Sequence, residues 1–175
     1  MVQNNARNFV NEGAPMYKTK IDLSEKLRRN VIVILNDRLA DAIDLQSQVK
    51  QAHWNVKGPQ FIALHELFDK ISDVVLEQID EIAERVTSLG GTAEGTVAVA
   101  AKRSKLKNYP LSITAGKDHL FYLSTQVAAF GKSVRAAIAN SDELGDADTA
   151  DLFTGISRDL DKYLWFLEAH LQEKA

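Results

Sequence analysis

The chain has 175 residues, of which 45% are hydrophobic and 26% charged, a balance typical of one globular domain. It contains no cysteine, which excludes disulfides, thiolate metal sites and thiol nucleophiles, so any metal site must use imidazole and carboxylate ligands. The net charge of −3 argues against a chain-wide electrostatic attraction to nucleic acid.

The first 21 residues are polar and show no apolar periodicity. They predict a flexible N-terminal arm over residues 1–21 that packs little, followed by one domain over residues 22–175. The arm lacks the apolar segment of a signal peptide, and no apolar run reaches the roughly 18 residues that a membrane span requires. We therefore expect a cytoplasmic protein with no membrane partner.

Two long helices are predicted next. Asp22 or Ser24 is a candidate N-cap, and apolar residues keep helical spacing from there to the break at Gly58-Pro59. The pattern resumes at Phe61 and continues until Gly90-Gly91, which predicts a C-terminal stop.

The second half of the chain begins with a long connection over residues 90–115, whose apolar patch "TVAVAAKRSKL" predicts a small helix. Two further helices are predicted over residues 116–140 and 147–173, separated by the acidic loop "NSDELGDAD". A connection of this length fits a crossover along a bundle. The sequence therefore predicts an all-α, ferritin-like four-helix bundle with a short helix in the long middle crossover.

The second predicted helix carries ligand-type side chains on one stripe. At 100° per residue from His65, Asp69 lies at about 40°, Asp80 at about 60° and Glu84 at about 100°. A solvated stripe would be expected to mix lysine or arginine with its carboxylates, whereas this stripe mixes them with Leu76 and alanine. Two interpretations remain open, a metal site and an ordinary acidic face with one histidine at its edge.

Axial distance limits how such a site could form. Asp69 and Asp80 are separated by about 16 Å along the helix, so one metal cannot contact both. The two halves can meet only if a second copy of the helix packs antiparallel across a two-fold axis near Val74 and Val75. His53, just ahead of the Gly58-Pro59 turn, can fold back beside His65. The geometry predicts two symmetric sites per dimer.

Two imidazoles and three carboxylates suit divalent iron, zinc or manganese. A hydrolytic zinc site would lack its usual His-Glu-x-x-His signature. An internal di-iron site is disfavoured because no histidine here has a glutamate three residues before it.

The segments "HWNVKGPQFIALHELFD", "DEIAERVTSLGGTAEGT" and "DTADLFTGISRDLDKYLWFLEAHL" resemble the Dps family of ferritin-like proteins from about Leu23 onward. The resemblance implies a hollow homododecamer with ferroxidase centres at its two-fold interfaces. It assigns the iron ligands to five residues, His53, His65, Asp69, Asp80 and Glu84.

The resemblance further implies that Fe(II) is oxidised, preferably by hydrogen peroxide, and stored as a ferric mineral, which protects against oxidative stress. Trp54 matches the tryptophan beside the family's centre, either as a quencher of oxidising equivalents or as an interface anchor. Asp146, Asp148 and Asp151 match the region that lines three-fold pores in relatives, although acidic residues ahead of a helix also complement its dipole.

Two alternatives have different chemistry. In the first, the protein compacts nucleoid DNA and binds metal only secondarily; the arm offers Arg7, Lys18 and Lys20 against Glu12, a weak basic balance. In the second, the dimer holds Zn²⁺ as a structural, non-redox ion. The remaining histidines, His119 and His170, have no convergent carboxylates and are interpreted as packing or surface residues.

Overall fold

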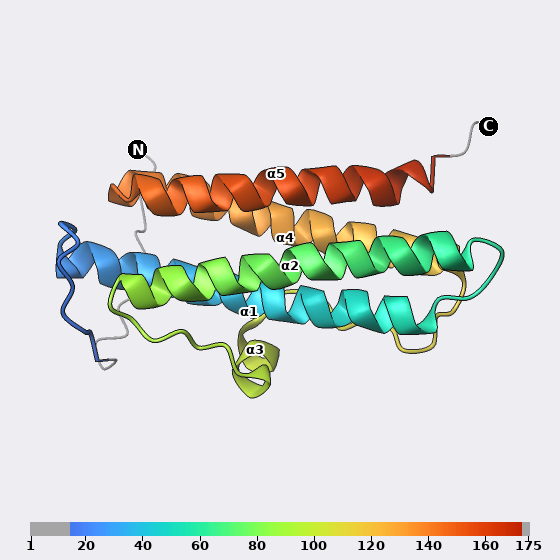
Figure 1. Ribbon diagram of the computed structural model, residues 1–175, viewed down its shortest axis with the longest axis horizontal. Coiled ribbons are helices and arrows are strands. Elements are labelled where there is room, and N and C mark those ends of the chain that lie inside the picture. The colour runs from blue at the N-terminus through green and yellow to red at the C-terminus, as the bar shows by residue number, and fades with distance from the viewer. Residues whose placement is uncertain (1–14, 173–175) are drawn as a thin grey trace, which may run out of the picture.

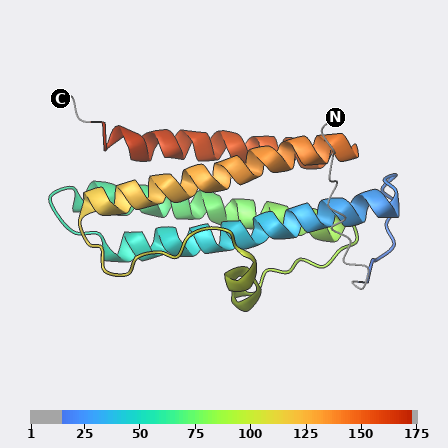
Figure 2. The same ribbon diagram turned by 180° about the vertical axis from the view of Figure 1, so that it is seen from behind.

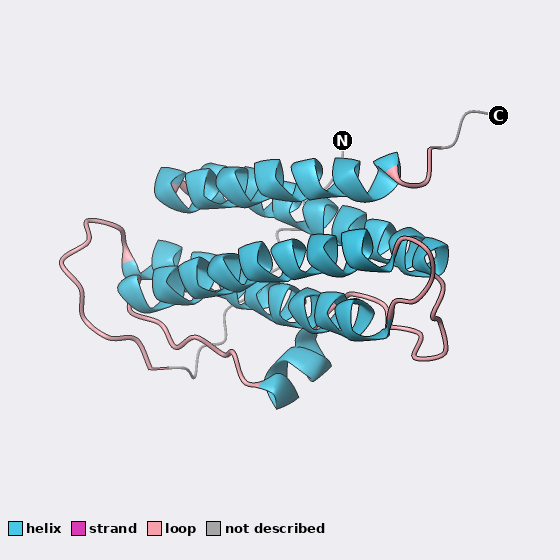
Figure 3. Ribbon diagram, turned by 45° about the vertical axis from the view of Figure 1, so that its right-hand side comes forward, coloured by secondary structure: helices cyan, strands magenta, loops and turns pink. Residues whose placement is uncertain are grey.

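The computed structural model describes residues 15–172, which form four long helices and one short one. The helices are α1 (Glu25–Asn55), α2 (Phe61–Ser88), α3 (Val97–Arg103), α4 (Gly116–Leu144) and α5 (Ala147–Ala169). Helices α1 and α2 form one antiparallel hairpin and α4 and α5 form another (Figure 1), and the view from behind shows the same pairing (Figure 2). Every regular element of residues 15–172 is a helix (Figure 3). The predicted all-α bundle with a short helix in its middle crossover is confirmed.

The ends of the first two helices are set by local chemistry. Ser24 caps α1, because its hydroxyl accepts a hydrogen bond from the Leu27 amide at 3.3 Å. Beyond the C-terminal end of α2, Gly90 adopts a φ of +86°. A Cβ at this glycine would lie 2.4 Å from the carbonyl oxygen of Tyr17, so both the dihedral and the close approach require glycine.

The arm differs from its prediction over residues 15–21. The Tyr17 amide donates a 2.8 Å hydrogen bond to the Gly90 carbonyl, and Met16 and Ile21 pack against the core. This part of the chain is therefore fixed to the end of the bundle, because two scattered apolar side chains and one backbone bond find partners there. Residues 1–14 of the predicted arm lie outside the described residues.

The prediction of a long acidic loop between the last two helices is wrong. Helix α4 continues to Leu144, and only Gly145 and Asp146 separate it from α5. The helix persists because Ser141 and Leu144 still face the interior, while Gly145 ends it in the left-handed region at a φ of 90°. The acidic composition of this segment was therefore not enough to predict a loop.

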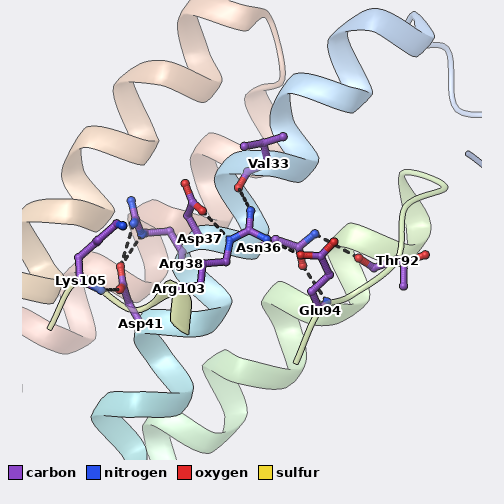
Figure 4. Close-up of polar contacts among 9 residues, drawn as sticks. All are labelled: Val33, Asn36, Asp37, Arg38, Asp41, Thr92, Glu94, Arg103 and Lys105. Carbon is purple, nitrogen blue, oxygen red and sulfur yellow. Dashed lines mark hydrogen bonds and ion pairs between the residues drawn. The ribbon is translucent and has the colours of Figure 1, made fainter. Parts of the chain in front are cut away.

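The crossover runs along the outside of α1, and arginine and carboxylate side chains tie it there. Arg103, at the end of α3, bonds Asp37 at 2.6 Å and also pairs with Glu94 (Figure 4). The buried carboxylate of Asp41 accepts the Lys105 amide at 2.8 Å. These polar contacts add to the packing of Ala93, Ala100 and Leu106 in holding the segment against the bundle.

Apolar side chains from all four long helices form the core. Its largest fully buried side chains are Phe68, Phe130 and Phe153, one each from α2, α4 and α5. In the described part of the chain, no helix combines the length and the apolarity needed to cross a membrane.

Candidate metal centre

The turn between α1 and α2 places two histidines next to each other. Gly58 takes a φ of +117° and accepts a hydrogen bond from the Phe61 amide, which starts α2. The Lys57 amide donates to the Thr114 carbonyl at 2.9 Å, which ties the turn to the segment before α4. As a result, His53 in the last turn of α1 faces His65 in the second turn of α2.

The two imidazoles stack, with ring centroids 3.7 Å apart and an interplanar angle of 21°. Nδ1 of His53 lies 2.8 Å from the carbonyl oxygen of His65, and Nδ1 of His65 lies 2.9 Å from that of His53. A carbonyl oxygen only accepts, so each Nδ1 must carry a proton. In the neutral rings the lone pair then lies on Nε2, the form in which imidazole binds a metal.

Asp69 lies one helical turn beyond His65 and next to His53, with its Oδ1 3.8 Å from the His53 Nδ1. The Lys50 ammonium donates a 2.6 Å hydrogen bond to the same oxygen. This bond is the main cause that lowers the pKa of Asp69, with His53 and His65 adding to the effect and desolvation opposing it. No sequence pattern indicated this ion pair, because Lys50 and Asp69 are on different helices.

Asp80 and Glu84 lie farther along α2 on the same stripe, neither of them buried. At about 1.5 Å per residue, Asp80 is about 16 Å from Asp69 along the axis. Within residues 15–172 of one chain, no three His, Asp or Glu side chains converge to hold a metal. Between the two halves lies Leu76, which is 55% exposed, and at the turn end Ile62 is 62% exposed. A single chain therefore presents two half-sites on a partly apolar face.

Comparison with known proteins identifies the chain's relatives. Residues 32–175 match the ferritin-like domain family. A DNA protection during starvation protein from Agrobacterium fabrum is 52% identical over 159 residues, covering 91% of this chain and 98% of the relative. DpsC from Streptomyces coelicolor superposes with a TM-score of 0.87 at 30% identity, covering 91% of this chain and 94% of that one. The Mycobacterium smegmatis Dps (tetragonal form) gives 0.84 at 31% identity, covering 90% and 96%.

The chain belongs to the Dps family.

In this Dps-family chain, the three aspartates predicted to line a pore have different environments. Asp146 is 2% exposed and caps α5, accepting bonds from the Thr149 amide at 3.0 Å and the Thr149 hydroxyl at 2.6 Å. It also pairs with Arg85 of α2 at 2.7 Å. Asp148 and Asp151 are exposed. Asp146 thus joins α5 to α2, which leaves Asp148 and Asp151 to face solvent.

The other residues noted in this Dps-family chain are placed as follows. Trp54 is 67% exposed beside the half-site, with the Lys50 Nζ 5.9 Å from its ring centroid. His170 is exposed at the end of α5, whereas His119 is fully buried in the first turn of α4. Sequence reasoning did not single out Tyr109, whose hydroxyl pairs with His119.

Proposed function

We propose that the protein is a ferroxidase and iron store, which oxidises Fe(II), preferably with hydrogen peroxide, and retains the ferric product as mineral. The observation that carries the proposal is the stacked pair of His53 and His65 beside Asp69, in which each Nδ1 bonds a backbone carbonyl and so leaves Nε2 as the metal-binding atom of the neutral ring. Asp80 and Glu84 on the same stripe supply the carboxylates of the second half-site. Oxygen and imidazole donors of this kind suit both ferrous and ferric iron.

The complete site requires two chains. An antiparallel contact between two copies of α2, with its two-fold axis near Val74 and Val75, brings His53, His65 and Asp69 of one copy to the carboxylates of the other. The exposed Leu76 and Ile62 lie on the face that this contact buries. We extend this dimer to the dodecamer of the Dps family and place the protein in the cytoplasm.

Two iron ions held together allow peroxide to be reduced in one two-electron step. Two ferrous ions each lose one electron, and peroxide takes both electrons and two protons to form two waters. No hydroxyl radical is released in that balance. The residues of this chain bind and orient the iron, and their negative charge favours the ferric product over the ferrous substrate.

Iron enters, in this proposal, through pores lined by Asp148 and Asp151, whose exposed carboxylates concentrate cations. Trp54 lies beside the site and serves as an anchor or as a quencher of oxidising equivalents. Zn²⁺ fits the same donors and would occupy the site without redox chemistry.

The test is to add two ferrous ions per site to the metal-free protein without oxygen, then peroxide, while following ferric absorbance and trapped hydroxyl radical. We expect fast oxidation with little radical. Asp80→Ala and Glu84→Ala should each slow the fast phase and leave the assembly intact. If both variants oxidise iron like the parent, the assignment of these ligands is wrong.

DNA binding is a second candidate function, because the Agrobacterium fabrum relative is named for DNA protection. The DNA phosphates would be bound by Lys18, Lys20 and Arg7, and the multivalency of a dodecamer would increase the affinity. Gel retardation across a salt series, with and without residues 1–21, tests it. Retardation that survives removal of the arm would contradict this mechanism.

A further inference from the structure

A partly buried tyrosine and a fully buried histidine form a hydrogen-bonded pair close to the half-site. Tyr109 lies in the crossover just before α4, and His119 lies in the first turn of α4 with none of its surface exposed. The Tyr109 hydroxyl hydrogen-bonds Nδ1 of His119, and the two rings lie with centroids 6.0 Å apart. The proposed iron chemistry makes no use of this pair.

The pair sits at the same end of the bundle as His53 and His65. The ring of His119 is 6.4 Å, centroid to centroid, from that of Phe68, the residue before Asp69. The backbone of Asn55, two residues after His53, is close enough to His119 to influence its pKa. The pair therefore lies next to residues that neighbour two of the proposed metal ligands in the chain.

The environment fixes which atom holds the proton. Burial raises the pKa of Tyr109, and the neighbouring Tyr122 raises it further, so the phenol stays protonated. Burial lowers the pKa of His119, and Asp118 and the Asn55 backbone only partly oppose this. At neutral pH the phenol therefore donates its hydrogen bond to a neutral imidazole, which is a base able to accept the proton.

We propose that Tyr109 and His119 act together as a sink for one-electron oxidising equivalents that escape from the iron site. The proposal rests on the proposed function for the source of these equivalents, which is a hydroxyl radical formed when a lone ferrous ion reduces peroxide. The radical takes one electron from Tyr109 and becomes hydroxide. The phenolic proton moves to Nδ1 of His119, which leaves a neutral tyrosyl radical beside an imidazolium.

A second ferrous ion then restores the pair. It gives one electron to the tyrosyl radical and becomes ferric, while the proton returns from Nδ1 to the phenolic oxygen. The sum over both steps is two ferrous ions oxidised per peroxide, with both oxygen atoms leaving as hydroxide. The pair thus recovers the stoichiometry of the two-electron reaction when that reaction fails.

The neighbouring tyrosine lacks the internal base. The hydroxyl of Tyr122 donates to the backbone carbonyls of Lys107 and Asn108 at 2.7 and 2.6 Å, and a carbonyl is too weak a base to take the proton. Tyr122 packs edge-on against Tyr109 with centroids 4.9 Å apart. Tyr122→Phe is therefore a matched control, close in space and without the base.

The first experiment mixes the Fe(II)-loaded protein with peroxide, freezes it rapidly and records the electron paramagnetic resonance spectrum. We expect a tyrosyl radical in the parent and in Tyr122→Phe, and its loss in Tyr109→Phe. In His119→Gln the rate of radical formation should fall by a factor of about ten or more, because the proton acceptor is gone. A signal unchanged in Tyr109→Phe overturns the proposal.

The second experiment tests the pair in the absence of iron. The metal-free protein is oxidised by photogenerated ruthenium(III) tris-bipyridine, and a fluorinated tyrosine at position 109, which preserves the hydroxyl and the fold, marks the radical by its altered hyperfine splitting. Altered splitting supports the pair even if the parent oxidises no iron, a failure that the ferric absorbance reports separately. Unaltered splitting, or equal rates in His119→Gln and the parent, overturns the pair.

Discussion

Lys50 places an ammonium group on Asp69, where an incoming cation would need to bind. The hydrogen bond of 2.6 Å lowers the pKa of Asp69, so the carboxylate is ionised at neutral pH and already has a cationic partner. A depressed pKa stabilises the folded protein above the ordinary aspartate value and loses that contribution as the pH falls through the lowered one. A metal ion bound at Asp69, as proposed above, would compete with this partner.

We therefore expect Lys50→Met to tighten binding of Co²⁺, a spectroscopic probe of the site, by roughly fivefold, because a partly exposed ion pair no longer competes. Titration of the metal-free protein, followed by the Co²⁺ absorption bands, measures the change. Lys57→Met is the control, since the Lys57 side chain is exposed in the adjoining turn. Equal or weaker binding by Lys50→Met would show that Lys50 does not compete.

The buried carboxylate of Asp146 both caps α5 and pairs with Arg85. Asp146→Ala removes the cap of α5 and leaves the Arg85 guanidinium without its 2.7 Å partner. We expect the free energy of unfolding to fall by about 3 kcal/mol, as for other broken buried pairs. Thermal unfolding at fixed protein concentration measures this. Asp148→Ala, at an 86% exposed side chain, should change little, and an equal effect of both variants would refute the assignment.

At the scale of the elements, two glycines with positive φ connect helices in different surroundings. Gly90 follows α2 with a φ of +86° and approaches Tyr17 closely, whereas Gly58 at the α1–α2 turn has a φ of +117° and no atom within 4 Å of where a Cβ would lie. Both alanine variants incur backbone strain. Only the one at Gly90 also clashes.

We expect Gly90→Ala to destabilise the protein by about 2 kcal/mol more than Gly58→Ala, since the clash adds to the strain. The variant should also release residues 15–21 from the bundle. Urea unfolding gives the first quantity, and limited proteolysis within residues 15–21 reports the second. Equal losses of stability with equal protection from protease would mean that contact with Tyr17 matters little.

At the scale of the whole molecule, the half-sites on α2 predict that activity depends on two chains. A variant with His65→Ala keeps Asp80 and Glu84, and a variant with both carboxylates changed to alanine keeps the histidines. Each should lack fast iron oxidation alone. After the two are unfolded and refolded together, about a quarter of the sites should be intact, because half of the random dimers are mixed and each mixed dimer has one complete site.

The amplitude of the fast phase of iron oxidation by peroxide measures this complementation. The control mixes the same two variants without unfolding, so that the subunits do not exchange. No recovery after co-refolding, with assembly confirmed by size, would contradict a shared site and favour one contained in a single chain.

Much of the bundle could be predicted because its signals are local. Helical spacing, the Ser24 cap and the Gly90 stop each involve residues within one or two turns, and they indicated the helices and their order. The loop predicted after residue 140 was wrong, since whether Ser141 and Leu144 face a core depends on what packs there. The candidate ligands could be selected by residue type and angular spacing on one helix.

By itself, the sequence determined the helical elements, the long crossover and the stripe of candidate ligands on α2, because helical period and capping act over a few residues. Only the tertiary structure decided which side chains meet. Lys50 bonds Asp69 across 19 residues, Arg85 bonds Asp146 across 61, and the histidines orient each other across 12. These contacts depend on how helices pack, and packing is set by the summed burial of the whole core and not by any short segment.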